Sequence, residues 1–456
     1  MISSVTKPIV FIKNILNKGH SRSVNAKKNI LASFLIKGGS IAVSLISVPL
    51  TIHYVNPAQY GIWLTLSSLV SWFGFFDIGF GNGLRNKFAE AKAKGETDLS
   101  RTYISTTYAV LTIIGSIVLL VFVCVNPFLN WAQILNAPAA MESELSLLAL
   151  IVFGFFCFDF VLQLIVTILN ADQQPAKASL FNFFASLLSL AIIFILTKTT
   201  KGNLIYLGLS FVGTQLVILL AASLWFFSGK YKMYAPSLKY VKFKYARNLM
   251  GLGLKFFIIQ IAFIVLYETT IIIIAQLFGP EQVTPYNIAF KYFSVIPMVF
   301  GIILIPFWSA FTEAYYKQDF AWIRSSMKNL IGIWILFSVG GIIMLLLSDT
   351  VYRLWVGPEI KVPFLLSATI VSYIIANAWC TIYSVFLNGV GKLKLQLYSS
   401  IIGALINIPL ALFLGKQFGI MGIVLSTLIL ALGNAVWSPI QYRKIMNNTA
   451  SGIWNA

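Results

Sequence analysis

The sequence predicts an all-α integral membrane protein with twelve transmembrane helices arranged in two six-helix lobes. Of the 456 residues, 58% are hydrophobic and only 10% are charged, whereas ordinary soluble domains carry roughly 25% charged residues. A soluble protein this apolar could not cover its own surface with polar groups, so its surroundings must be lipid. Since a membrane-spanning helix needs about 20 mostly apolar residues, the chain is long enough for twelve.

Hydropathy divides the chain into these spans. The expected spans are 30–53, 60–80, 104–125, 145–170, 178–197, 204–227, 251–277, 285–310, 329–347, 363–388, 396–414 and 420–440. The expected domains are an interfacial N-terminal arm (1–29), an N-terminal lobe (30–227), a basic linker (228–250), a C-terminal lobe (251–440) and a tail (441–456).

The net charge of +19 follows the expected topology. With the N-terminus in the cytoplasm, 25 of the 33 Lys and Arg residues fall in cytoplasmic segments and 5 in the outer loops. An excess of this kind is the positive-inside signal, and it predicts that both termini are cytoplasmic. The charge is therefore assigned to topology and anionic lipid, and no nucleic-acid partner is expected. The three cysteines lie in apolar runs without His neighbours, so no disulfide or metal site is expected.

An internal repeat relates the two halves. A shift of 223 residues places Phe88 on Phe311, Glu90 on Glu313, Lys94 on Lys317, Arg101 on Arg324 and Pro57 on Pro280. A shift of 218 aligns the ends of spans four and ten. Because each lobe has an even number of spans, both lobes have the same orientation, and the repeat is a parallel one.

Polar residues recur on single faces of several spans. Span one carries Ser33, Lys37, Ser40, Ser44, Ser47 and Thr51, spaced alternately by four and three, which keeps them on one side of a helix. Serines alone favour close packing between helices. Lys37 favours a water-filled cavity instead, because an ammonium at the centre of a span costs about 2.5–3.5 kcal/mol. Snorkelling of Lys37 to the cytoplasmic interface is the alternative.

Further candidates share this pattern. Lys291 lies between Asn287 and Ser294 on span eight, while Lys255 is close enough to the end of span seven to reach the interface by snorkelling. Asn182 belongs to a polar face of span five. Asp159 occupies the repeat position of Asn377, so one lobe carries a carboxylate where the other has an amide. For Asp77 and Asp159, a hydrogen-bonded core role and a role in proton coupling stand as equal alternatives. For Glu268, a role as structural partner of a cation in its own lobe has at least equal weight with coupling.

The run FDIGFGNGLRNKFAEA at 76–91 resembles the segment after span two in polysaccharide repeat-unit (O-antigen) flippases. These flippases belong to the multidrug/oligosaccharidyl-lipid/polysaccharide (MOP) exporter superfamily, which also includes the MATE transporters. The segments VPLTI (48–52) and YGIW (60–63) are also similar to that family. The resemblance implies a cationic central cavity lined by Lys37, Lys255 and Lys291, with Arg85 at its inner mouth. The expected polar lining is Ser40, Ser44, Asn182, Asn287 and Asn377. The residues left open for H⁺ or Na⁺ coupling are Asp77, Asp159 and Glu268.

The resemblance also implies a function. Such proteins move an undecaprenyl-diphosphate-linked oligosaccharide from the cytoplasmic to the periplasmic leaflet of the bacterial inner membrane by alternating access. No enzymatic activity and no cofactor are expected. The expected partners are the lipid-linked substrate and membrane lipids, with a polysaccharide polymerase and the chain-length machinery as further candidates. A drug/cation antiporter of the same fold is the alternative, and a membrane-embedded glycosyltransferase or polymerase is a more distant one.

Overall fold

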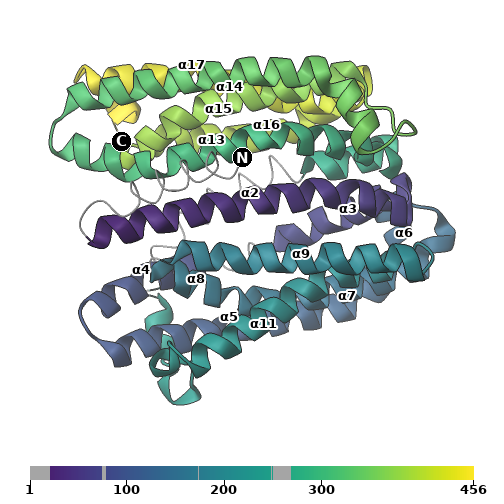
Figure 1. The fold of residues 1–456 in the computed structure, drawn as a ribbon, viewed down its shortest axis with the longest axis horizontal. Helices are drawn as coiled ribbons and strands as arrows, with labels where there is room; N and C mark the ends of the chain where they lie inside the picture. Colours follow the sequence, from purple (N-terminus) through teal and green to yellow (C-terminus); the bar gives the residue numbers. More distant parts are fainter. Residues whose placement is uncertain (1–20, 74–78, 173, 248, 250–268, 456) are drawn as a thin grey trace, which may run out of the picture.

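The computed structural model describes residues 21–73, 79–172, 174–247, 249 and 269–455, and all regular secondary structure in these ranges is helical. Ten of the described helices are long and apolar enough to cross a membrane, which confirms a multi-pass helical membrane protein. The helices run roughly parallel to one another in two groups, which we call the N-lobe and the C-lobe (Figure 1).

The N-lobe contains the helices of the first half of the chain. They are α2 (Ser21–Val55), α3 (Pro57–Ser71), α4 (Phe80–Ala93), α5 (Thr97–Val125), α6 (Trp131–Ile134), α7 (Glu142–Leu162), α8 (Leu164–Ala171), α9 (Pro175–Thr199), α10 (Leu204–Gly208) and α11 (Thr214–Ser228). The C-lobe contains α13 (Val283–Tyr316), α14 (Phe320–Trp355), α15 (Phe364–Val390), α16 (Lys394–Phe418) and α17 (Ile420–Met446). A shorter helix over Thr269–Phe278 precedes α13.

Two of the twelve expected spans are only partly covered. The span expected over 60–80 contains α3, which ends at Ser71, and most of the span expected over 251–277 lies outside the described residues. The segment after the second span, expected as a cytoplasmic connection, is helical as α4. The reason is a stripe of buried apolar residues at helical spacing, Phe80, Leu84, Phe88 and Ala91, which packs against α5 and α8.

The backbone follows the internal repeat closely. Helices α4 and α13 end at positions 223 apart, as do the first residues of α5 and α14. Between them, Gly95 and Gln318 occupy equivalent positions, and both have positive φ (75° and 59°). Asn56 and Gly279 are equivalent too, with φ of 117° and 92°. A repeat that was visible as matched residue types is therefore a repeat of helix ends and turns.

The lobes meet at one end of the molecule only, as far as the described residues show. One buried apolar cluster contains residues of both lobes, such as Val48 and Ile52 of α2 together with Val283 and Tyr286. The other two clusters belong to one lobe each: one is confined to the C-lobe and one to the N-lobe. We call the end where the lobes meet the closed end, and the opposite end, which carries the basic connections, the basic end.

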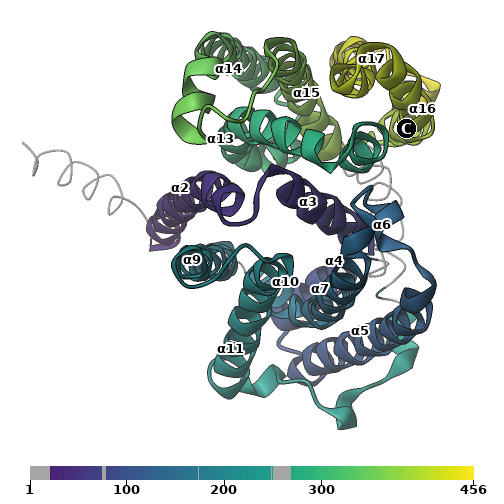
Figure 2. The ribbon, with the colours of Figure 1, turned by 90° about the vertical axis from the view of Figure 1, so that its right-hand side faces the viewer.

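The linker between the lobes is attached to the N-lobe. After α11, residues 229–247 run along α5 (Figure 2). The Arg101 guanidinium donates a hydrogen bond to the Ala235 carbonyl (2.9 Å). The backbone N–H groups of Ser237 and Lys242 donate to the hydroxyls of Ser105 and Thr106. This part of the linker therefore forms one body with the N-lobe.

Candidate functional site

The contact between the lobes at the closed end obeys the internal repeat. The Thr284 hydroxyl donates a hydrogen bond to the Pro57 carbonyl (2.6 Å). The equivalent pair is Gly61 and Pro280: a Cβ at Gly61 would lie 1.7 Å from the Pro280 carbonyl oxygen. The two turns that begin with Pro57 and Pro280 thus pack against each other about a pseudo-twofold axis. Only glycine permits the approach on the N-lobe side.

The next contact along α13 is a buried hydrogen bond between side chains. The Tyr60 hydroxyl donates to Oδ1 of Asn287 across the lobes (3.1 Å), and both residues are buried. At the edge of the same contact, the Asn136 amide donates to the Ala275 carbonyl (2.9 Å). Asn287 was expected to line a polar cavity, and the structure places it within the contact between lobes.

Lys291 lies one turn further along α13 toward the basic end. Its ammonium donates a hydrogen bond to the Ser44 hydroxyl of α2 (2.6 Å). From the start of α13, eight residues at 1.5 Å each place Lys291 roughly 12 Å into the span. The structure therefore brings together two candidate residues that are 247 positions apart in the chain. Their hydrogen bond joins α13 of the C-lobe to α2 of the N-lobe.

A second contact between the lobes involves Leu45, the residue of α2 that follows Ser44. Pro49 lies inside α2, and because proline has no N–H, the carbonyl four residues earlier loses its helical donor. That carbonyl belongs to Leu45, and it accepts a hydrogen bond from the Trp355 indole of α14 (2.8 Å). A neighbouring helix thus satisfies the group that proline leaves free, as membrane interiors require.

The other polar residues of α2 differ from Ser44. The hydroxyls of Ser40, Ser47 and Thr51 donate to carbonyls of their own helix. Such bonds suit helix packing and leave no donor for another lobe. Lys37 is half-buried, two turns nearer the basic end than Ser44. On the stripe of α2, Ser44 is therefore the described serine that contacts the C-lobe.

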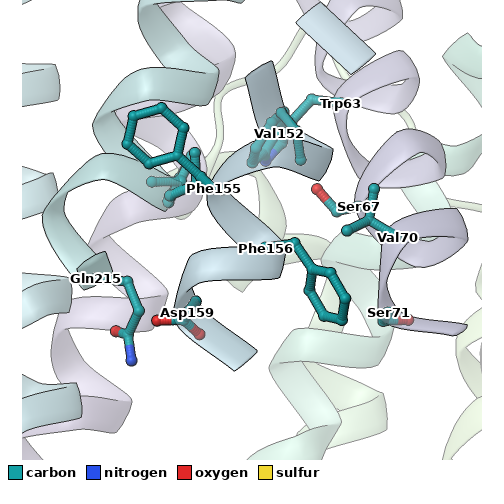
Figure 3. A pocket seen from close by; sticks show the side chains of 11 residues that line it. Trp63, Ser67, Val70, Ser71, Val152, Phe155, Phe156, Asp159 and Gln215 are labelled. Atoms are coloured by element: carbon teal, nitrogen blue, oxygen red, sulfur yellow. The ribbon is translucent and has the colours of Figure 1, made fainter. Parts of the chain in front are cut away.

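The N-lobe contains a separate cavity of about 370 Å³, lined by a carboxylate, polar groups and aromatic rings. Asp159 of α7 points toward Gln215 of α11, and Ser67 of α3 lies across the space (Figure 3). One carboxylate oxygen of Asp159, Oδ1, and the Ser67 hydroxyl are buried without a hydrogen-bond partner among the described residues. The aromatic lining is Trp63, Phe155, Phe156 and Phe211.

Two helix irregularities shape this cavity. Span four breaks at Gln163, between α7 and α8, one turn after Asp159. Span six contains a π-helical segment, Leu209–Gly213, between α10 and α11, and its Phe211 and Val212 line the cavity. π-helical turns often occur at functional sites because they re-aim side chains. Neither irregularity contains a proline, the usual sequence sign of a break in a helix. The hydropathy of these spans did not indicate the breaks either.

The remaining candidates are dispersed or lie outside the described residues. Arg85 is exposed on α4. Asn182 is exposed and accepts a hydrogen bond from the Gln215 amide (3.1 Å), which links α9 to the wall of the Asp159 cavity. Asn377 is half-buried on α15. The candidates that lie outside the described residues are Asp77, Lys255 and Glu268.

Sequence reasoning missed a charged cluster at the basic end of the N-lobe. The Asp172 carboxylate, 9% exposed, pairs with Lys92 and Lys230 and accepts hydrogen bonds from Gln174 and Tyr231. Burial raises the pKa of Tyr231 to about 12, so its hydroxyl keeps its proton at neutral pH and donates a hydrogen bond to Asp172. The cluster joins α4, the turn before α9 and the linker. The lysines had been attributed to the membrane interface.

Comparisons with known proteins agree with this architecture. Residues 26–308 match the family described as "Polysaccharide biosynthesis protein". A protein of Salmonella typhi named "Putative O-antigen transporter" is 21% identical over 422 residues, covering 91% of this chain and 95% of its own. An inward-facing multidrug resistance MATE family transporter of the MOP superfamily has a TM-score of 0.75 at 12% identity, with coverage of 92% and 100%. The lipid II flippase MurJ has a TM-score of 0.66 at 13% identity, with coverage of 92% and 90%.

The chain has the same fold as these MOP-superfamily transporters, with two helical lobes that meet at one end. The chain belongs to the polysaccharide biosynthesis protein family. The resemblance seen in the segments before and after span two is thereby confirmed.

Proposed function

We propose that the protein is a flippase for a lipid-linked oligosaccharide, such as an O-antigen repeat unit joined to undecaprenyl diphosphate. The observation that carries the proposal is Lys291, a cation roughly 12 Å inside a span, on the face that one lobe presents to the other. Membership in the polysaccharide biosynthesis family supports it, as do the names of the O-antigen transporter relative and of the MurJ neighbour.

The chemistry of the substrate explains why cations belong there. A diphosphate cannot enter hydrocarbon unless protein groups replace its water. Lys37 and Lys291 supply ammonium groups, and Ser44 supplies a hydroxyl that does not donate to its own helix. The membrane potential contributes about 2.3 kcal/mol per charge per 100 mV, which drives an anionic head group outward from a cell with a negative interior.

The proposed orientation follows from charge. Because Lys and Arg concentrate at the basic end, we place that end in the cytoplasm, with both termini, and the membrane is the bacterial inner membrane. The state described here is then open toward the cytoplasm. The protein acts as a carrier rather than an enzyme, without a cofactor, and hands its substrate to a polysaccharide polymerase and the chain-length machinery on the outer side.

Ion coupling is the second part of the proposal. The Asp159 cavity contains a buried carboxylate oxygen and a buried serine hydroxyl, both without a described partner. A quiet core aspartate would have both oxygens hydrogen-bonded, so this geometry favours a site that takes up H⁺ or Na⁺ in one stage of the cycle. Asp77 and Glu268 remain further candidates for coupling.

A drug/cation antiporter remains the second candidate function, because the same cavity combines a carboxylate with four aromatic rings. Aromatic faces and a carboxylate together suit an organic cation. The two functions differ in the site they require. A flippase binds its substrate through Lys37 and Lys291, whereas an antiporter binds its organic cation through Asp159.

The decisive experiment reconstitutes the protein in vesicles that contain a fluorescent undecaprenyl-diphosphate-linked saccharide. A membrane-impermeant quencher then measures how much substrate has crossed. We expect the protein to accelerate crossing and ethidium to be left untransported. Ethidium export without movement of the lipid-linked saccharide would establish the antiporter instead.

A further inference from the structure

Four residues of α13 and the turn before it contact the N-lobe in order, at helical spacing. Pro280 meets Gly61, Thr284 binds the Pro57 carbonyl, Asn287 binds Tyr60 and Lys291 binds Ser44. Steps of four, three and four keep all of them on one face of the helix. We call this series the closed-end ladder; it lies where α13 faces α2 and α3 (Figure 2).

Lys291 is the last rung of the ladder on the side of the basic end. Beyond it on the same face, the Ser294 hydroxyl donates back to the Lys291 carbonyl (2.8 Å). Met298 is 45% exposed, and a Cβ at Gly301 would meet nothing within 4 Å. A solute that enters from the basic end therefore reaches Lys291 before any other rung.

The bond that holds Lys291 joins a cation to a neutral hydroxyl. None of the ion pairs between described residues includes Lys291, and Ser44 is its hydrogen-bond acceptor. An ammonium group binds a phosphate oxygen more strongly than it binds a neutral hydroxyl, because ammonium and phosphate are both charged. An anion at this depth would therefore displace Ser44. The other three rungs contain no cation with which an anion could compete.

We propose that Lys291 triggers the opening of the closed end. A phosphate-bearing head group binds the Lys291 ammonium in place of Ser44, which breaks the rung nearest the basic end and weakens the contact between the lobes. A ligand shifts a conformational equilibrium only through its different affinities for the two states. Competition with Ser44 supplies that difference, because the anion binds Lys291 freely only after the rung has broken. The role of Lys291 rests on the proposed function, which supplies the anion.

The test measures the opening of the closed end directly, with inorganic pyrophosphate as the probe. Lys201 and Lys361 are exposed in loops of the N-lobe and the C-lobe at this end. Both are replaced by cysteine and spin-labelled in a Cys124→Ser background, since Cys124 is exposed and the other two cysteines are buried. The distance distribution between the labels is recorded in phosphatidylethanolamine/phosphatidylglycerol vesicles, with and without pyrophosphate. We expect pyrophosphate to increase the long-distance population.

Two matched variants each remove one rung. Ser44→Ala removes the acceptor of Lys291, and Thr284→Val removes a rung without a charge. Both should raise the long-distance population without pyrophosphate. Thr284→Val should keep the full response to pyrophosphate, whereas Ser44→Ala should lose most of it, because the anion no longer has a bond to displace. Lys291→Met should not respond at all.

Equal responses in Ser44→Ala and Thr284→Val would overturn the trigger role, and so would an unchanged response in Lys291→Met or an unresponsive parent. Flipping in vesicles is measured in parallel. Flipping by the parent together with equal responses in the two variants would reject the trigger while leaving the flippase intact. Absence of flipping by the parent would reject the proposed function itself.

Discussion

The indole N–H of Trp355 donates a 2.8 Å hydrogen bond to the backbone carbonyl of Leu45, in the other lobe. The carbonyl is available because Pro49, four residues later, cannot donate to it. The C-lobe contains the same device: Pro439 lies inside α17, and the Trp379 indole donates to the Ala435 carbonyl (3.2 Å). A proline in one spanning helix and a tryptophan on a helix packed against it thus form a unit, once within a lobe and once between lobes.

This pair of units gives a matched comparison. Trp355→Phe and Trp379→Phe should each cost about 1–3 kcal/mol, because each leaves a carbonyl unsatisfied in an apolar setting. Thermal unfolding in detergent measures that cost. Only Trp355→Phe should also shift the distance between labels at the closed end. An equal shift in Trp379→Phe would show that the Leu45 bond has no special part in joining the lobes.

Gly61 offers a steric test of the same contact. A Cβ there would lie 1.7 Å from the Pro280 carbonyl oxygen, so Gly61→Ala should force the lobes apart at the closed end and favour the opposite state. The control is Gly154→Ala on α7, where a Cβ meets nothing within 4 Å. The distance between spin labels at positions 201 and 361, in the Cys124→Ser background, would report the opening, and Tyr60 stays in place. A distance change of equal size in both variants would contradict the steric role of Gly61.

The substrate lysines should be essential for export. We expect Lys37→Ala and Lys291→Ala to abolish surface glycan while protein levels stay near normal, because the cavity would lose the ammonium groups that replace water around a diphosphate. Lys→Arg should be tolerated better than Lys→Ala, since it keeps the charge. The exposed Lys198 in the last turn of α9 serves as the control, and Lys198→Ala should export normally. Normal glycan in both lysine variants would mean that these lysines are not part of the substrate path.

We expect the dependence of flipping on a proton gradient to require Asp159. If its carboxylate changes protonation during the cycle, Asp159→Asn removes that step, so flipping in vesicles should depend less on an imposed pH gradient. The fold should survive, because the equivalent position in the C-lobe already holds an amide, Asn377, and asparagine keeps similar hydrogen-bonding capacity. Undiminished dependence on the gradient would assign Asp159 to the core.

Topology can be tested with reporter fusions. Fusions at Ala93, Ser237 and Lys394, at the basic end, should report cytoplasm, and fusions at Asn136 and Pro358, at the closed end, should report periplasm. The physical reason is the concentration of Lys and Arg at the basic end. A periplasmic signal at Ser237 would be incompatible with two lobes of the same orientation.

Local patterns in the sequence were enough for most of the membrane-spanning helices and for the repeat. Runs of apolar residues predicted the spans, because a lipid environment imposes hydropathy on each segment independently. The shift of 223 predicted equivalent helix ends, and the structure places Gly95 and Gln318 in equivalent turns of positive φ. The spacing of Lys37, Ser40 and Ser44 identified one face of α2, because helical geometry fixes which residues share a face.

The partner of each polar group was decided only by the tertiary structure. Three serines and a threonine on one stripe are indistinguishable by spacing, yet only Ser44 among them meets Lys291, 247 residues away, while Ser40, Ser47 and Thr51 bond their own helix. Likewise, a proline at position 49 leaves the Leu45 carbonyl without its helical donor, but only the structure shows that Trp355 binds it. Periodicity determines which side of a helix is polar; what that side touches depends on how the two lobes are placed, and no local pattern encodes that placement.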